Sequence, residues 1–180
     1  GSNIMTDTKI HTFIQGIYQL PEEIIQDFTK HLQRQDLPKG YFLHREGQIC
    51  ENLWMVETGL LRHFGVDKNG KEKNIWFTPE NSLTTDTSSF FNQTISYENI
   101  QLIEDSVVFK ICYKSIIELQ NKYHSFCLWF IKMLENQYFI QIEQRIAELQ
   151  FLDATERYKI LLEKNPSFSQ RISLGNLASY

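Results

Sequence analysis

The spacing of apolar residues changes twice along the chain, and this predicts helices first, then strands, then helices again. A helix is expected to begin at Pro21, because proline is tolerated in the first turn of a helix. The apolar residues that follow recur at intervals of three and four, which is helical spacing: Ile24, Ile25, Phe28 and Leu32.

The middle of the chain consists of short apolar runs separated by turn residues. The clearest hairpin signal is Asn69-Gly70, because both residue types accept the positive φ that tight hairpin turns require. It lies between the runs 60–66 and 71–77, and two further runs cover 97–103 and 106–111. Many short strands with turns at this spacing predict an antiparallel sandwich or jelly roll.

Helical spacing returns in the last third of the chain. A short helix is expected over 115–119 and a long one over 126–150, about 37 Å at 1.5 Å per residue. Six apolar residues of the long helix form one stripe: Ile131, Leu134, Tyr138, Ile142, Ile146 and Leu149. Other apolar residues lie off this stripe, so we favour a helix between its own sheet and a second copy of the chain, a homodimer. A helix deeply buried in one monomer is the alternative.

Two shorter helices are expected near the C-terminus. Asp153 and Glu156 form the pattern of a capping box, and this helix should end before Pro166. A last helix should open at Ser173, and by itself it should bury almost nothing. We interpret it as the start of an incomplete unit.

Composition and motifs narrow the function classes. The net charge is −4, which argues against a body that holds nucleic acid through a basic face. Three scattered cysteines and five histidines without metal spacing predict no disulfide framework, metal or cofactor. No nucleophile motif indicates an enzyme, so no catalytic residue is expected.

No apolar stretch is long enough to span a membrane, and we expect a cytoplasmic protein. The first two residues, Gly1-Ser2, are expected to be a tag scar.

Four segments, in this order, resemble landmarks of the Crp–Fnr family of bacterial transcription regulators: Leu37-Pro38-Lys39-Gly40, Arg45-Glu46-Gly47-Gln48, Glu57-Thr58-Gly59-Leu60-Leu61-Arg62 and Ser96-Tyr97-Glu98-Asn99-Ile100. The resemblance implies an α+β fold in which a cyclic-nucleotide-binding-like antiparallel jelly roll carries flanking helices and a long C-terminal dimerisation helix. A winged helix-turn-helix follows in that family.

The resemblance also implies a division of the chain. Residues 1–19 would be an N-terminal extension, 20–124 the jelly roll, 125–150 the dimerisation helix, and 151–180 the start of an incomplete winged helix-turn-helix. DNA is read by the second helix of such a motif. We therefore expect DNA to be bound only through residues that this chain lacks.

Family members that bind a cyclic nucleotide hold the ribose with a glutamate and the phosphate with an arginine. Asp86 falls at the glutamate position and Ser96 at the arginine position. No Lys or Arg occurs between Lys73 and Lys110, and Glu98 would repel a phosphate. Losing such a charge-assisted contact costs about 1.5–3 kcal/mol, more than tenfold in affinity. The resemblance therefore supports the fold and argues against cyclic AMP as the ligand.

Two interpretations of this degenerate pocket stay open. It is either remodelled for an unknown neutral or cationic small-molecule effector, or vestigial, with Asp86 and serines capping a short helix and Tyr97 packed in the barrel. The candidate residues are Asp86, Ser88, Ser89, Ser96, Tyr97 and Glu98. The function expected is the sensor and dimerisation portion of a regulator. The alternatives are a stand-alone jelly-roll module that binds a non-nucleotide small molecule or a protein partner, and a cupin-like enzyme, whose paired histidine ligands are missing.

Overall fold

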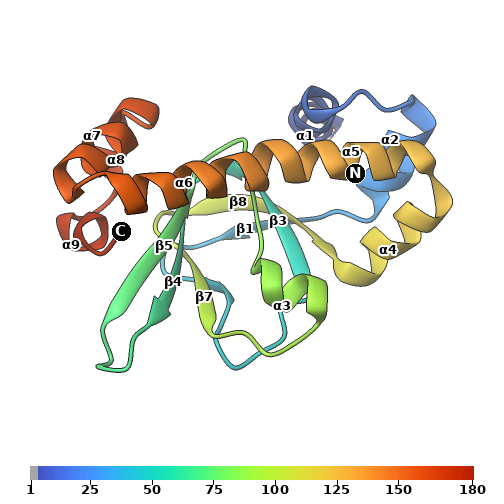
Figure 1. Cartoon of the computed structure of the whole chain (residues 1–180). Coiled ribbons are helices and arrows are strands. Elements are labelled where there is room, and N and C mark those ends of the chain that lie inside the picture. Colours follow the sequence, from blue (N-terminus) through green and yellow to red (C-terminus); the bar gives the residue numbers. More distant parts are fainter. Residues whose placement is uncertain (1–3) are drawn as a thin grey trace.

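The computed structural model describes the chain from residue 4 to residue 180, with side chains from Thr8 onward. In this part of the chain, helices lie at both ends and eight strands lie between them (Figure 1). The predicted tag scar lies outside the described residues. Among the described residues, no helix combines the length and apolarity needed to cross a lipid bilayer.

The strands form two four-stranded antiparallel sheets, as a jelly roll requires. The first sheet has the order β1 (Gln33–Leu37), β8 (Ser106–Cys112), β3 (Asn52–Thr58) and β6 (Leu83–Thr84). The second has the order β2 (Phe42–His44), β7 (Glu98–Leu102), β4 (Leu61–Val66) and β5 (Glu72–Thr78). The expected α+β fold with an antiparallel jelly roll is confirmed.

The hairpin predicted at Asn69-Gly70 joins β4 to β5, but its turn differs from a two-residue turn. The loop runs from Asp67 to Lys71, and Gly70 has φ +78° whereas Asn69 does not have a positive φ. The carboxylate of Asp67 accepts hydrogen bonds from the backbone N–H groups of Asn69 at 2.8 Å and Lys71 at 3.0 Å. This side chain closes the longer loop and removes the need for a second positive φ.

Two helices precede the first strand, and the sequence analysis identified only the second. Helix α2 (Glu22–Lys30) begins after Pro21 as expected. Helix α1 (Ile4–Ile17) lies within the segment 1–19, and its Ile14 is fully buried. The backbone carbonyl of Ile14 accepts a hydrogen bond of 2.8 Å from the indole N–H of Trp129. The N-terminal segment is therefore part of the core.

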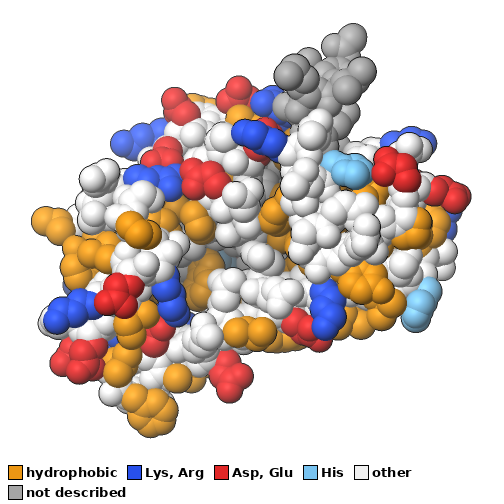
Figure 2. All heavy atoms as spheres, turned by 90° about the horizontal axis from the view of Figure 1, so that it is seen from above, with side chains coloured by type: hydrophobic (Ala, Val, Ile, Leu, Met, Phe, Trp, Pro, Cys, Tyr) orange, Lys and Arg blue, Asp and Glu red, His pale blue; other side chains and the backbone are white. Residues whose placement is uncertain are grey.

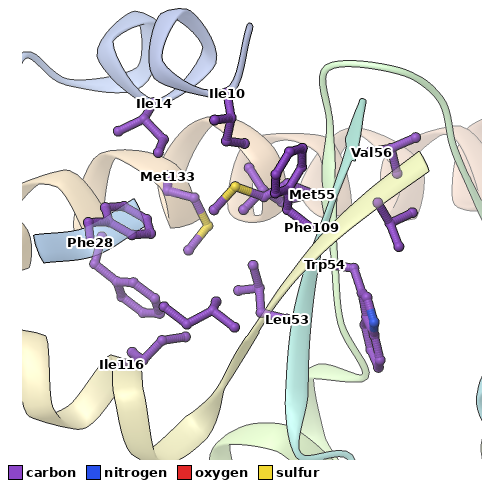
Figure 3. Packing of buried hydrophobic residues seen from close by; sticks show 14 of the residues in the cluster. Ile10, Ile14, Phe28, Leu53, Trp54, Met55, Val56, Phe109, Ile116 and Met133 are labelled. Carbon is purple, nitrogen blue, oxygen red and sulfur yellow. The ribbon is translucent and has the colours of Figure 1, made fainter. Parts of the chain in front are cut away.

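The main core extends from the surrounding helices through the first sheet to Leu61, Ile100 and Leu102 of the second sheet, and Figure 3 shows part of it. Ile10 and Ile14 of α1 face Met133, while Leu53 and Met55 of β3 approach from the other side. The short helix predicted over 115–119 is α4 (Tyr113–Lys122), which contributes its buried Ile116 and Leu119.

The long helix consists of three consecutive elements: α5 (His124–Leu134), a π-helical turn η1 (Glu135–Phe139) and α6 (Ile140–Phe151). It crosses the whole molecule above the strands (Figure 1). The predicted single α-helix is thus interrupted. In η1 the N–H of Ile140 donates to the carbonyl of Glu135, five residues earlier, which makes a wider turn than the α-helix has.

Three helices follow: α7 (Ala154–Lys164), α8 (Phe168–Arg171) and α9 (Leu174–Ala178). The capping box is confirmed: Asp153 accepts from the N–H of Glu156 at 2.8 Å, and Glu156 accepts from the N–H of Asp153 at 3.1 Å. Helix α9 opens at Ser173 as expected. The expectation that it buries almost nothing is wrong, because Leu177 is buried in a second apolar cluster.

This second cluster joins the C-terminal helices to the jelly roll. Its buried members are Leu60, Phe77, Phe168, Ile172 and Leu177. At its edge the guanidinium of Arg171 donates to the carboxylates of Glu80 and Glu104, each at 2.6 Å, and to the carbonyl of Gly59 at 3.0 Å. Burial raises the pKa of Glu80, but the hydrogen bonds from Arg171 and backbone groups outweigh it, so the pKa lies below its usual value.

Candidate functional site

A cavity of about 220 Å³ lies between the two sheets, the start of α3 (Thr87–Asn92) and the middle of the long helix. Much of its wall is apolar and aromatic: Leu53, Trp76, Leu83, Phe91, Met133 and Tyr138. Its polar wall includes His63, Asp86, Ser88 and Glu98, and none of the described residues that line it is Lys or Arg. A concave apolar pocket with a few convergent polar groups is the usual form of a small-molecule site.

Asp86 is held in place from several directions. It is buried at the N-cap of α3, where its carboxylate accepts from the N–H of Ser89 at 3.4 Å. The hydroxyl of Ser96 donates to the same carboxylate. Burial raises the pKa of Asp86, but interactions with His44, Ser96 and the N–H of Ser89 outweigh it and leave the pKa below its usual value. Asp86 is therefore an anion at neutral pH.

Glu98 and His63 meet across paired strands. His63 of β4 lies opposite Ile100 of β7, and Glu98 lies opposite Gly65. His63 and Glu98 are thus diagonal neighbours on one face of the sheet, within reach of long side chains. Their Nε2 and Oε2 atoms are 2.6 Å apart.

A second histidine lies behind Asp86. His44 of β2 also lies opposite Ile100, on the other side of β7 from His63. Its side chain is 3% exposed, and its Nε2 lies 3.7 Å from Oδ2 of Asp86, too far for a hydrogen bond. This Nε2 has no hydrogen-bond partner among the described residues.

The structure places the six predicted pocket residues in three environments. Asp86, Ser88 and Glu98 line the cavity. Ser89 and Ser96 are buried behind it, where Ser89 Oγ accepts from the N–H of Cys50 at 2.8 Å. Tyr97 does not line the cavity and is 85% exposed, so the expectation that it packs in the barrel is wrong.

Sequence reasoning missed the two histidines of this region. His44 and His63 show no regular spacing along the chain, and only the pairing of β2 and β4 with β7 places them on either side of Ile100. Ligand atoms of His63, Asp86 and Glu98 all lie within 4.8 Å of one another, the distance at which such groups can share a metal ion.

The six residues of the predicted apolar stripe lie in two different environments. Leu134, Tyr138 and Ile142 line the cavity. Ile131, Ile146 and Leu149 are about half exposed. The π-helical turn lies between Leu134 and Ile142 and changes the direction in which later residues point.

The family comparison matches residues 34–123, half of the chain, to the cyclic nucleotide-binding domain. The comparison with curated protein sequences gives no match.

The solved structures that share the fold include the following three. A protein described as a transcriptional regulator of the Crp/Fnr family from Eubacterium rectale has a TM-score of 0.70 and 14% identity, over 89% of this chain and 76% of that one. The catabolite activator protein of Thermus thermophilus has a TM-score of 0.61 and 17% identity, over 87% and 72%. The sensor domain of the regulator DNR from Pseudomonas aeruginosa has a TM-score of 0.60 and 18% identity, over 83% and 99%.

The matched segment begins in β1 and ends after α4, so it contains both sheets and the cavity residues that they carry. The chain therefore belongs to the cyclic nucleotide-binding domain family, and it shares its fold with transcription regulators of the Crp/Fnr family.

Proposed function

We propose that this chain is the sensor and dimerisation portion of a Crp/Fnr-like transcription regulator, without enzymatic activity, and that its effector is not cyclic AMP. One observation carries the second part of the proposal. The cavity presents two carboxylates, Asp86 and Glu98, and none of its described lining residues is Lys or Arg.

A cyclic nucleotide carries an anionic phosphate, which binds well only where a cation or several N–H donors replace its water. Ser96, at the position of the family's arginine, is buried and already bonds to Asp86. Glu98 adds a second negative charge to the wall. These charges support a neutral or cationic effector.

Calorimetric titration of the purified chain with cyclic AMP tests this part. We expect a Kd weaker than about 100 μM, which corresponds to less than about 5.5 kcal/mol of binding free energy. The variant Glu98→Gln removes one negative charge and keeps the shape of the side chain. A clearly lower Kd in this variant would attribute weak binding to repulsion by Glu98, whereas an unchanged Kd would attribute it to the missing cation. A low-micromolar Kd for the parent chain would overturn the proposal.

The proposed dimer rests on apolar side chains that the long helix leaves in contact with water. They include three residues of the predicted stripe and three others, each between 49% and 79% exposed: Ile131, Phe139, Ile140, Ile146, Leu149 and Phe151. Figure 2 shows hydrophobic side chains at several places on the face seen from above. Exposed apolar groups of this number on one element are typical of an interaction surface. Sedimentation should find a dimer, whereas a monomer at high micromolar concentration would contradict it.

The long helix also supports the proposed sensing role, because it borders the cavity directly. Leu134, Gln137 and Tyr138 contribute to the wall, and the side-chain oxygen of Gln137 accepts from the N–H of Leu83 at 3.4 Å. A bound effector would therefore touch the element proposed to pair two protomers, as in a switch that acts through an interface helix. In this proposal, DNA is contacted by a helix-turn-helix outside the 180 residues.

A further inference from the structure

Three groups that commonly bind metals converge on the polar wall of the cavity. They are the imidazole of His63 on β4, the carboxylate of Asp86 before α3, and the carboxylate of Glu98 at the start of β7. One ligand atom from each lies within 4.8 Å of the other two. The three side chains therefore come from separate elements and meet at one point.

The chemistry of this set favours a divalent transition ion. Imidazole suits first-row ions such as Zn²⁺, whereas Mg²⁺ prefers oxygen ligands and retains several waters. Two carboxylates match a double positive charge, and none of the described lining residues is a Lys or Arg that would compensate them. The contact of 2.6 Å between His63 Nε2 and Glu98 Oε2 involves only one of the two carboxylates.

The buried His44 supplies a second, independent indication. Its Nε2 lacks a hydrogen-bond partner among the described residues and points at Asp86 from 3.7 Å. Ser96 and the N–H of Ser89 hold the same carboxylate. Metal-ligating carboxylates are held by outer groups of this kind, which orient them and are costly to remove. An unpaired buried nitrogen is otherwise unfavourable in an apolar core.

We infer that the cavity binds one divalent first-row transition metal ion through His63 Nε2 and the carboxylates of Asp86 and Glu98. The inference rests on the proposal that this cavity is the effector site, and it names the ligand. A metal ion needs the lone pair of His63 Nε2, so any proton on this atom moves to Nδ1 or leaves to solvent when the ion binds. His63 Nε2 and Glu98 Oε2, now 2.6 Å apart, must then separate to roughly 3.0–3.4 Å, as two bonds of about 2.1 Å to one ion require at octahedral to tetrahedral angles.

The test is a titration of the chelator-treated 180-residue chain with Zn²⁺ by calorimetry, and with Co²⁺ by visible absorption. We expect one ion per chain. The variants His63→Ala and Glu98→Gln should each weaken Zn²⁺ affinity by more than about 10-fold and reduce the Co²⁺ absorption bands. His44→Gln should keep the stoichiometry and weaken affinity by about 10-fold.

The control is His11→Ala. His11 and Glu22 form an exposed pair of the same residue types at 3.1 Å, so this variant removes a surface histidine without touching the cavity. It should leave Zn²⁺ affinity unchanged. Thermal melts followed by circular dichroism identify any variant that fails to fold, and Glu98→Gln, on a partly exposed side chain, provides a mild substitution.

The inference is overturned if the parent chain shows no saturable Zn²⁺ binding. It is also overturned if folded His63→Ala and Glu98→Gln proteins bind Zn²⁺ as tightly as the parent. These results are separate from those of the proposed function, since sedimentation and cyclic AMP titration are carried out without metal. A monomer that binds Zn²⁺ would contradict the dimer and leave the metal site intact.

Discussion

Gly59, between β3 and β4, occupies a position that no other residue type fits without strain. Its φ is +109°, and a Cβ built there would lie 1.9 Å from Oγ of Ser106. We predict that Gly59→Ala lowers the free energy of unfolding by about 1–3 kcal/mol, because the neighbouring strand must shift and the backbone is strained. Urea unfolding measures the change. Gly16→Ala is the matched control: with no atom within 4 Å of its Cβ and a helical backbone, it should be neutral or stabilise by up to about 1 kcal/mol.

Asp86 has a structural role as well as its place in the cavity wall. We predict that Asp86→Ala lowers the free energy of unfolding by about 1–3 kcal/mol, since α3 loses its cap and Ser96 loses its acceptor. The control Ser88→Ala changes a more exposed residue of the same wall and should stay within about 0.5 kcal/mol of the parent. Equal stability of the Asp86→Ala protein and the parent in urea unfolding would contradict this role.

The same variant carries a pH dependence with a definite sign. The folded pKa of Asp86 lies below its usual value of about 3.9, so the folded state favours the carboxylate. Its contribution to stability is therefore full above about pH 4 and is lost as pH falls through the folded pKa. Urea unfolding at several pH values should show the difference between Asp86→Ala and the parent narrowing below about pH 4.

At the scale of residues, the sequence predicted part of the site. Asp86 and Glu98 could be found from their distance to recognisable landmarks. His44 and His63 could not be found in this way, because they are related only through strand pairing: each lies opposite Ile100 on β7. Tyr97 was expected in a strand, but it forms a bend just before β7 begins at Glu98, and its side chain is exposed.

At the scale of elements, strong local signals were reliable. The capping box at Asp153 and the hairpin around Gly70 each depend on nearby residues, and both are confirmed. Helix α1 has a signal of the same kind, with Ile10, Ile14 and Ile17 at helical spacing. The π-helical turn has no such signal, because its residues are compatible with an ordinary α-helix.

Arg171 adds a polar attachment between α8 and the jelly roll, beside the second apolar cluster. We predict that Arg171→Ala lowers the free energy of unfolding by about 1.5–3 kcal/mol, because Glu80 and Glu104 lose their shared partner. Hydrogen exchange should become faster in residues 154–180 and stay unchanged in β3 and β8. Lys164→Ala is the control, since this exposed pair with Glu148, at 3.3 Å, contributes little. Unchanged exchange in Arg171→Ala would show that the apolar cluster alone holds the helices.

At the scale of the whole molecule, the proposed dimer can be tested by adding charge to the long helix. Ile146→Glu places a carboxylate on a residue that is 58% exposed in one protomer. If this residue lies in an interface, the charge must lose its water, and we expect dimer affinity to fall at least tenfold, about 1.4 kcal/mol. Sedimentation measures this. Gln26→Glu adds the same charge to an exposed position on α2 and should have no effect. A dimer equally strong in both variants would exclude this face.

The π-helical turn at Glu135–Phe139 interrupts an otherwise regular α-helix. It holds one residue more than an α-helical turn, at the place where the helix borders the cavity. Converting it to ordinary α-helical pitch would rotate α6 about its own axis by about 100°, the angle of one residue. Phe139, Ile140 and Ile146 would then swing to a different side of the molecule. An occupant of the cavity that changes the pitch of this turn would thereby change the direction in which these hydrophobic groups point, and with it the interface of the proposed dimer.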